Sequence, residues 1–405
     1  MNVLVNKRIL IIGFVWPEPK SSAAGSRMMQ LISFFKVNGG RITFACTASE
    51  SEFSEELNDI CCKHISLNSS SFDDFIIELQ PDLVLFDRFM TEEQFGWRVA
   101  QQCPNAFRIL DSEDLHCLRE ARRLNVLKNK PFDLNNDLAM REIACIFRCD
   151  VTLVISEFEF KLLQTHFKVP LFQLFYLPIW IENETLNLPT FEERNDFIFI
   201  GNFLHAPNHD AVVYLKEVIW PIIFDKFPDA KMNVYGAYPT QKIYSLHQPN
   251  INFYVHGRAA SSYEVISKAK VLLAPIRFGA GIKGKLLEAM EFGTPSVTSS
   301  IGAEAMNESF FWNGFVTESA VDFADKAIEL YKNKSVWLEA QQNGFEILKN
   351  RFSKDLFAFS FLNFLLDRFK NLSNYRNKNF IGLMLMHHSL QSTKYLSKWI
   401  EEKNR

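Results

Sequence analysis

The sequence predicts two consecutive α/β domains, each a doubly wound parallel sheet covered by helices. Short apolar runs alternate with helical stretches through residues 7–165 and again through 197–298, as parallel sheets require. The chain has 405 residues, more than the roughly 250–300 at which one hydrophobic core stops growing. Around 178–195 the alternation gives way to Pro, Glu, Asn and Thr, which is typical of a linker between domains.

The first series lies in the predicted N-terminal domain, residues 1–180. Its first strand is a continuous apolar run, and the helix that follows repeats its apolar residues at helical spacing. Another continuous apolar strand follows Pro81. The predicted strands are 7–14, 41–45, 82–86, 107–110 and 150–155, and the predicted helices are 26–37, 72–79, 134–147 and 157–165.

The second series lies in residues 196–352, after a predicted linker at 181–195. Its strands are expected at 197–200, 231–235, 252–255, 271–274 and 296–298, and its helices at 209–219, 263–267, 283–292, 321–332 and 335–349. Two facing domains of this kind leave a cleft between them. Open α/β sheets bind ligands outside the carboxyl ends of their strands, so we expect the functional site in this cleft.

The last region, 353–405, is predicted to be helical. Residues 354–369 are apolar on more than one face, which predicts burial on several sides. Residues 376–405 contain a further apolar stretch with Trp and Lys. This tail either packs on the N-terminal domain, the interpretation we favour, or lies as an amphipathic helix against a lipid surface or a partner.

Composition excludes several classes of protein. The formal net charge is −3, which argues against nucleic-acid binding through bulk charge. The seven cysteines are scattered without metal-ligand spacing, as expected of free thiols in a reducing compartment. No apolar run approaches the roughly 20 residues of a membrane span. The expected location is the cytoplasm, either free or attached to the inner face of a membrane.

The most informative segment is the glycine-rich loop between the strand at 271–274 and the helix at 283–292. Missing side chains at Gly279, Gly281 and Gly284 let backbone N–H groups approach a ligand, and a helix N-terminus attracts phosphate. Lys283 and Lys285 add positive charge that would stabilise a departing diphosphate. The alternative is that the glycines only form a turn, while Lys285 pairs with Glu288 on the helix surface.

Residues 279–304 closely resemble the donor-binding signature of family 4 glycosyltransferases, which have the GT-B fold of two facing Rossmann-like domains. Residues 199–211 resemble the opening of that family's C-terminal domain, 255–275 the segment that lines its base pocket, and 150–157 a recurrent strand-to-helix element. Residues 16–27 resemble its acceptor-side loop. The donor-binding residues that this resemblance implies are Gly201, Asn202, Gly257, Arg258, Gly279, Gly281, Ile282, Leu286 and Glu288.

The resemblance implies transfer of a sugar from a nucleotide-diphosphate sugar, with retention of anomeric configuration, to a saccharide, lipid-linked or protein acceptor. It also implies a last helix that crosses back to the first domain. Glu288 matches the second Glu of the family's Glu-x7-Glu motif, which binds the ribose. Ala280 stands where the first Glu is expected, and Asn202 and Asn208 stand near the place of an Arg and Lys pair.

These departures motivate two expectations. Lys283 or Lys285 would supply the charge for the diphosphate from the other side of the cleft. A rival interpretation is a nucleotide-sugar-binding or scaffold protein that has lost catalysis, and a different enzyme on the same fold, such as a sugar-nucleotide epimerase, is a further alternative.

On the first domain, polar residues follow the strand at 107–110. His116 is the candidate for the family's functional His that contacts the donor sugar, and Asp114 is a candidate acceptor-binding or orienting group. Alternatively, Asp111 or Ser112 caps a helix and His116 lies on its surface. The predicted acceptor-binding residues are Gly25, Arg27, Asp87 and Asp114.

Neither a metal ion nor another cofactor is expected. The chain contains no Asp-x-Asp sequence, so the usual carboxylate clamp for a divalent ion on a nucleotide diphosphate is missing. The nucleotide sugar would be a co-substrate. There is also no Walker A motif and no Gly-x-Ser-x-Gly sequence, which argues against a P-loop NTPase and a serine hydrolase.

Overall fold

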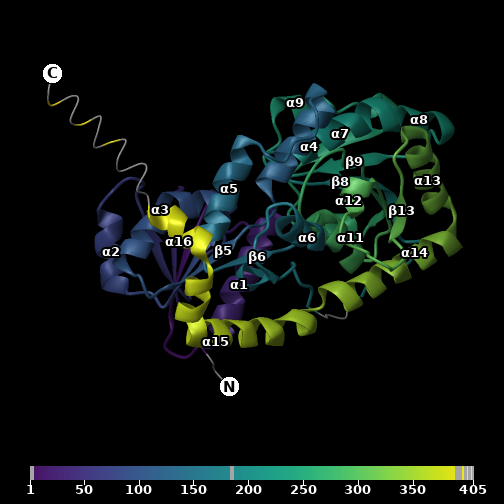
Figure 1. Ribbon diagram of the computed structural model, residues 1–405. Coiled ribbons are helices and arrows are strands. Elements are labelled where there is room, and N and C mark those ends of the chain that lie inside the picture. Colours follow the sequence, from purple (N-terminus) through teal and green to yellow (C-terminus); the bar gives the residue numbers. More distant parts are fainter. Residues whose placement is uncertain (1–3, 183–186, 388–394, 396–398, 400–402, 404–405) are drawn as a thin grey trace.

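The computed structural model describes residues 4–182, 187–387, 395, 399 and 403. Two parallel sheets form two lobes side by side, and one long helix, Lys354–Lys378, runs beneath the first of them (Figure 1). The predicted fold class, two Rossmann-like α/β domains with a helix that returns to the first, is confirmed. Among the described helices, none is long and apolar enough to cross a membrane.

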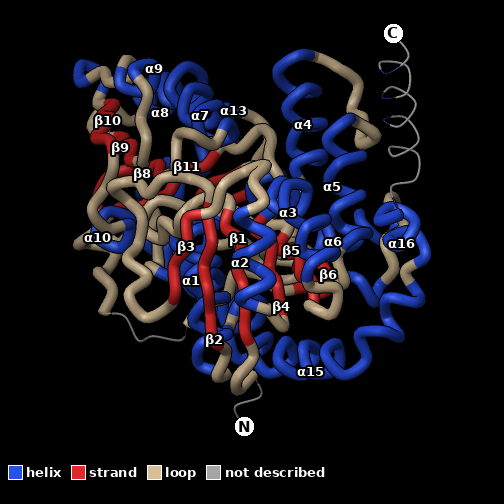
Figure 2. Tube along the Cα trace, turned by 90° about the vertical axis from the view of Figure 1, so that its left-hand side faces the viewer, coloured by secondary structure: helices blue, strands red, loops and turns tan. Residues whose placement is uncertain are grey.

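The first domain contains a seven-stranded parallel sheet in the order β3-β2-β1-β4-β5-β6-β7. Helices cover its two faces (Figure 2). The strands are β1 (Arg8–Gly13), β2 (Arg41–Cys46), β3 (Cys61–His64), β4 (Leu83–Asp87), β5 (Phe107–Asp111), β6 (Val151–Val154) and β7 (Leu174–Tyr176). The helices are α1 (Ala23–Val37), α2 (Ser71–Leu79), α3 (Arg88–Gln102), α4 (His116–Lys128), α5 (Asp137–Arg148) and α6 (Glu157–Thr165).

The second domain contains a six-stranded parallel sheet in the order β10-β9-β8-β11-β12-β13. The strands are β8 (Asn195–Ile200), β9 (Met232–Tyr235), β10 (Phe253–Gly257), β11 (Ala269–Ala274), β12 (Ser296–Thr298) and β13 (Gly314–Val316). The helices are α7 (Ala206–Tyr214), α8 (Trp220–Lys226), α9 (Gln241–Tyr244), α10 (Ser262–Ile266), α11 (Gly284–Glu291), α12 (Ser300–Ala303), α13 (Ala320–Lys332) and α14 (Lys334–Ile347). A single π-type turn at Leu215–Ile219 joins α7 to α8.

Burial explains why the central strands lack polar alternation. Every residue of β4 and β11 is buried, because helices pack on both faces of a doubly wound sheet. Continuous apolar runs were therefore the signal that predicted these strands. Both sheets fall inside the predicted ranges 1–180 and 196–352, except for Asn195 at the start of β8.

The chain crosses between the domains twice. Ile181 pairs with Ser353 in a parallel bridge where the two crossing segments run side by side. Helix α15 (Lys354–Lys378) then returns to the first domain, where Phe361 packs against Phe34 and Phe175. A kink at Asn371 divides α15, and α16 (Phe380–His387) follows it and packs against α5.

The prediction that 354–369 is buried on several sides is wrong. The Phe359 side chain is 73% exposed and Leu356 is also exposed, because α15 lies on the outside of the first domain and only one side of it faces the core. The prediction for the tail 376–405 is tested only as far as residue 387, where α16 packs on the first domain. Most of 388–405 lies outside the described residues.

Elements of both domains were not predicted, among them β3, β7, β13, α3, α4, α8, α9 and α12. β3 is an edge strand with exposed side chains and lacks an apolar pattern, and β7 has only three residues. Helices α3 and α4 begin directly after the polar ends of β4 and β5, and α3 turns two polar residues, Thr91 and Glu92, inward. This mixed pattern hides the 3.6-residue apolar period on which helix prediction depends.

Candidate active site

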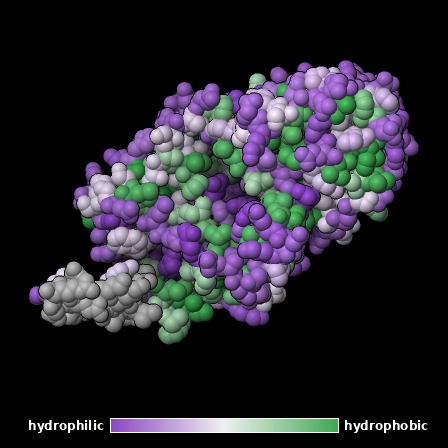
Figure 3. All heavy atoms as spheres, turned by 90° about the horizontal axis from the view of Figure 1, so that it is seen from above, coloured by the Kyte–Doolittle hydropathy of each residue, from purple (hydrophilic) through white to green (hydrophobic). Residues whose placement is uncertain are grey.

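A cavity of about 690 Å³ lies between the two domains. Its walls are the loops that follow β1, β4 and β5 on one side and β8, β9 and β11 on the other, all at carboxyl ends of parallel strands. Hydrophilic residues gather in the hollow between the two lobes (Figure 3). This is the position at which open α/β sheets bind ligands.

The structure brings most of the predicted site residues together around this cavity. It also adds residues from both domains that were not among the predicted site residues, among them Glu113, His205, Asn208 and Ser262. The predicted residues that line it are Gly25, Asp87, Asp114, His116, Gly201, Asn202, Arg258, Gly279, Ile282, Lys283, Lys285 and Glu288.

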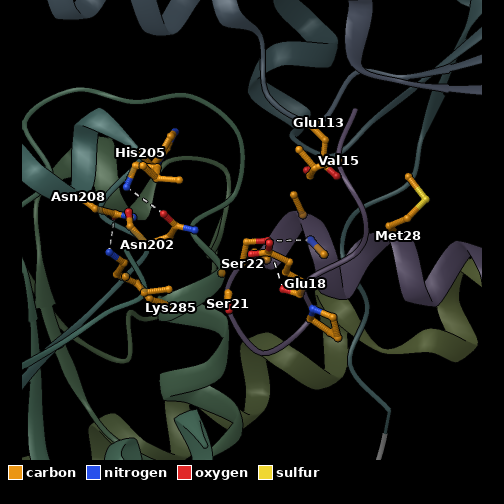
Figure 4. Close-up of a pocket in the computed structure, with 18 of the residues that line it drawn as sticks. Val15, Glu18, Ser21, Ser22, Met28, Glu113, Asn202, His205, Asn208 and Lys285 are labelled. Carbon is orange, nitrogen blue, oxygen red and sulfur yellow. Dashed lines mark hydrogen bonds between the residues drawn. The ribbon is translucent and has the colours of Figure 1, made fainter. Parts of the chain in front are cut away.

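Lys285 extends from the first turn of α11 toward the loop after β8. Its Nζ donates a hydrogen bond to Oδ1 of Asn208 at 2.6 Å and lies 4.3 Å from the centre of the Phe199 ring. A Cβ on Gly201 would lie 2.7 Å from this Nζ, so the glycine makes room for the ammonium group. Burial lowers the pKa of Lys285 to about 7. Figure 4 shows Lys285 and Asn208 on one side of the cavity.

Lys283 occupies the N-cap position of α11, where its side chain accepts no hydrogen bond from the helix. The first N–H groups of α11 therefore face the cavity without a capping side chain, which is the arrangement that binds anions. The Lys283 ammonium donates to the carbonyl of Gly281 at 2.8 Å. Burial lowers its pKa to about 8.

Glu288 lies one turn further along α11. Its Oε1 accepts a hydrogen bond from the Ser262 hydroxyl at 3.0 Å, and burial raises its pKa. The alternative of a surface pair with Lys285 is wrong, because the two side chains bond different partners inside the cavity wall. Sequence analysis did not identify Ser262 as a site residue. Its only local signal is its place in the first turn of a short helix that Ser261 caps.

His116 begins α4 and lines the opposite wall. Its Nε2 lies 3.6 Å from Oδ1 of Asp114, and its ring packs edge-on against Phe89. Burial lowers the pKa of His116 to about 4, so the imidazole is neutral at pH 7. Burial alone would raise the pKa of Asp114, but the Arg119 guanidinium, which is bonded to it, holds that pKa well below its usual range.

His205, from the second domain, comes close to this cluster. Its Nε2 lies 3.5 Å from Nη1 of Arg119, and burial lowers the pKa of His205 to about 4. Nothing in the sequence singles out His205, because its relevance depends on how the two domains face each other. The alternatives in which Asp111 or Ser112 caps the helix are also wrong, since Leu115 occupies the N-cap position of α4.

Two further predicted residues shape the first-domain wall. A carboxylate oxygen of Asp87 accepts a hydrogen bond from the backbone N–H of Phe14 at 3.0 Å, which ties the end of β4 to the end of β1. A Cβ on Gly25 would lie 2.4 Å from the backbone of Glu18. Gly25 therefore allows the loop before α1 to fold closely over the start of that helix.

Four predicted residues do not line the cavity: Arg27, Leu286, Gly257 and Gly281. Arg27 is 1% exposed, and its guanidinium bonds the carboxylate of Asp111 at 2.7 Å and the carbonyl of Leu177 at 2.7 Å. This corrects the prediction that it binds the acceptor: the buried ion pair joins α1 to β5. Leu286 packs in the core of the second domain, because its side chain is on the opposite side of α11 from the cavity.

Gly257 and Gly281 act through the backbone instead. Both have positive φ, 80° and 64°, a region that favours glycine. A Cβ on Gly257 would lie 2.9 Å from the Tyr244 hydroxyl, and one on Gly281 would lie 2.8 Å from Cβ of Asp114 in the other domain. Gly281 therefore permits close approach of the two domains, a role that differs from the predicted donor contact.

Polar contacts join the domains around the cavity. Arg122 of α4 forms a two-pronged ion pair with Glu304 at 2.8 and 2.6 Å, and also donates to the carbonyl of Gly279 at 2.8 Å. Tyr238 donates its hydroxyl hydrogen to Glu18 at 2.7 Å. These pairs connect the two domains across the cleft.

The described residues contain no group of three or more His, Cys, Asp or Glu side chains placed to hold a metal ion. Positive charge near the start of α11 comes instead from Lys283 and Lys285, with Arg258 elsewhere on the same wall. This donor set suits an anionic ligand such as a diphosphate.

Comparison with known proteins is consistent with this geometry. Residues 194–333 match the family described as "Glycosyl transferases group 1", a region that contains β8, α11 and Glu288. An uncharacterised 44.6 kDa protein in the cps region of Klebsiella pneumoniae is 24% identical over 169 residues, which is 40% of this chain and 44% of that protein. The match thus spans less than half of the curated relative.

Solved structures are similar over most of the chain. Sucrose-phosphate synthase from Thermosynechococcus elongatus has a TM-score of 0.68 at 15% identity, over 90% of this chain and 100% of that one. TarM has a TM-score of 0.69 at 11% identity, over 90% and 99%. HepE of Anabaena, solved with UDP and glucose, has a TM-score of 0.64 at 13% identity, over 89% and 99%. These likenesses identify the GT-B fold.

Proposed function

We propose that this protein is a metal-independent glycosyltransferase that moves a sugar from a uridine-diphosphate sugar to a saccharide acceptor, with retention of anomeric configuration. The observation that carries the proposal is the position of Lys285. Its ammonium lies between Gly201 and Asn208, beside the open N-terminus of α11, with Glu288 one turn further on. The family match over 194–333 covers all of these residues.

The donor would bind mainly to the second domain. Its diphosphate would lie at the start of α11, where Lys285, Lys283 and the uncapped N–H groups provide charge and hydrogen-bond donors. Glu288 would accept hydrogen bonds from the ribose hydroxyls in place of the one from Ser262. Uridine is proposed because similar structures, HepE among them, hold UDP.

Catalysis would consist of stabilising the leaving group in a closed cleft. The bond between the anomeric carbon and the diphosphate oxygen breaks, and a bond from that carbon to an acceptor hydroxyl oxygen forms. Negative charge grows on the diphosphate as this happens, so Lys283 and Lys285 contribute most in the transition state. The departing phosphate can take the proton of the acceptor hydroxyl, and no separate strong base is needed.

His116 would orient the donor sugar from the first domain. Because its pKa is lowered to about 4, its ring is neutral and can form a hydrogen bond to a sugar hydroxyl without attracting the diphosphate. Retention of configuration is included because residues 279–304 resemble a family of retaining enzymes. The anomeric proton coupling of an isolated product would test it.

A second candidate is a protein that binds a nucleotide sugar without transferring it. Ala280 favours it, because this residue lines the cavity where a carboxylate would be expected to touch the donor sugar. Donor binding without transfer or hydrolysis would support this alternative.

The first test is a thermal-shift screen with uridine, guanosine, adenosine and thymidine diphosphates and their sugar conjugates. We expect stabilisation by UDP and UDP-sugars, unchanged by EDTA and lost in Glu288→Ala. Glu339→Ala, on the exposed surface of α14, is the matched control and should behave like the wild type. Stabilisation by none of these ligands would contradict the donor site.

A further inference from the structure

We infer that Glu113 is the centre of a subsite on the first-domain wall that binds an uncharged hydroxyl group of a saccharide acceptor. The inference rests on the proposed function, which names no residue for this contact. Glu113 lines the cavity directly after β5, and Figure 4 shows it beside Val15, across the cavity from Lys285 and Asn208.

The backbone at Glu113 is in an unfavourable conformation for its residue type. Its φ is 55°, in the left-handed region that Gly, Asn and Asp tolerate better than Glu. The preceding residue is fixed, because Ser112 donates both its backbone N–H and its hydroxyl to the carbonyl of Leu153, at 3.2 and 2.9 Å. Backbone strain of this kind is found preferentially at ligand-binding positions.

One oxygen of the Glu113 carboxyl group is buried without a hydrogen-bond partner. The residue is 7% exposed, and its Oε1 has no partner among the described residues. Arg27 is the nearest cation, with Nε 4.0 Å from that oxygen, but its hydrogen bonds go to Asp111 and Leu177. A buried polar atom is normally bonded, so no partner of its own fixes the Glu113 side chain, and it can turn toward a ligand in the cavity that the residue lines.

The surrounding charges indicate which ligand fits. Burial raises the pKa of Glu113 to about 8, and the negative charge of Asp111 acts in the same direction. The carboxyl is therefore protonated at neutral pH, and it can both donate and accept a hydrogen bond, as a sugar hydroxyl can. The other charged groups acting on it are Arg27, Arg88 and Asp87.

A charged ligand group fits less well at this position. An ammonium group would be repelled by the positive charges of Arg27 and Arg88, and a carboxylate or phosphate by the negative charges of Asp87 and Asp111. An uncharged hydroxyl avoids both conflicts. The donor diphosphate is proposed to bind on the second domain and the donor sugar to contact His116, so we assign this hydroxyl to the acceptor.

The test uses the full chain saturated with UDP and a panel of methyl glycosides of glucose, galactose, mannose and N-acetylglucosamine. Saturation-transfer NMR measures glycoside binding, and calorimetry measures UDP binding. We expect at least one glycoside to bind the wild type and to bind Glu113→Ala about tenfold more weakly. Glu113→Gln, which keeps a hydrogen-bond donor and an acceptor, should lose less glycoside affinity than Glu113→Ala. The UDP affinity should change less than about twofold in both variants.

Two controls separate binding from folding. Glu120→Gln, on α4 but outside the cavity, should bind the glycoside like the wild type. Glu113→Asn, which suits a positive φ better, should have a melting temperature no lower than that of the wild type and should still lose glycoside affinity. A purely structural role for Glu113 would instead lower the melting temperature.

The inference is overturned if glycoside affinity is the same in Glu113→Ala and in the wild type, or if UDP-saturated wild type binds no glycoside of the panel. It is also overturned if only amino or anionic sugars bind. Failure of UDP to bind the wild type would be a different result, because it would contradict the proposed function itself.

Discussion

The carboxyl group of Glu159 in the first domain accepts a hydrogen bond from the backbone N–H of Gly281 in the second, at 2.8 Å. The same oxygen accepts from the N–H of Leu115 at 3.0 Å. One buried side chain therefore links the loop before α4, which leads to His116, with the glycine-rich loop before α11. The close approach of the two domains at this point depends on this junction and on the absence of a side chain at Gly281.

Gly281→Ala should impair closure. The new Cβ would lie 2.8 Å from Cβ of Asp114 at a φ of 64°, so both sterics and backbone conformation oppose it. We expect the transfer rate to fall by about tenfold or more, with a smaller change in UDP affinity. Rapid-mixing kinetics and calorimetry would measure the two quantities.

Gly279→Ala is the matched comparison for this substitution. Its Cβ would meet only the Ile276 and Lys283 side chains, at 3.7 and 3.8 Å, which are ordinary contacts. Gly279→Ala should lower the transfer rate clearly less than Gly281→Ala does. If the transfer rate fell equally in the two variants, the close approach of the domains at Gly281 would not be the cause of the fall.

Removal of the Lys285 ammonium should weaken UDP binding. Lys285→Met loses charge-assisted hydrogen bonds to the diphosphate, which corresponds to a loss of about ten- to hundredfold in affinity. Calorimetry at constant ionic strength would measure it. An unchanged dissociation constant would exclude Lys285 from the diphosphate site.

The affinity for UDP should also depend on pH through Lys285. Burial lowers its pKa to about 7, and the diphosphate binds the protonated form. The affinity should therefore be highest at or below pH 7 and fall by up to about tenfold per unit above it, until the pKa of the complex is reached. Lys285→Arg stays charged, so a similar fall in that variant would point to another group.

His116→Asn should reduce the transfer rate without changing UDP affinity, because His116 is expected to contact the sugar and not the nucleotide. Burial lowers the pKa of His116 to about 4, so the wild-type rate should show no inflection from this residue between about pH 5.5 and 7. Initial rates across that range test the statement. An inflection that disappears in His116→Asn would show that the ring titrates there.

Arg27→Met should destabilise the fold. It removes one partner of a buried ion pair and leaves the Asp111 carboxylate without its guanidinium, which costs about 3–5 kcal/mol. Chemical denaturation would show this as a lower midpoint. If Arg27→Met were fully stable but defective in acceptor binding, the result would support the original prediction that Arg27 binds the acceptor.

The sequence by itself was sufficient to predict the central strands of both sheets and the glycine-rich loop before α11, and the family resemblance implied the crossing helix. Buried parallel strands and amphipathic helices leave local patterns, and a glycine-rich turn before a helix with Lys283, Lys285 and Glu288 needs only neighbouring residues to be recognised. Helices α3 and α4 were missed because each starts at a polar strand end, where the apolar period is interrupted.

Tertiary structure alone decided which polar residues face the cavity. Arg27 and Glu113 are both charged residue types next to predicted strand ends or loops, yet one is fully paired in the core, and the other lines the cleft and has one unpartnered carboxyl oxygen. His205 and the Glu159 junction exist as site features only when the domains face each other. The direction of a side chain at a strand end depends on a few backbone dihedrals and on contacts from distant segments, and neither leaves a periodic pattern in the sequence.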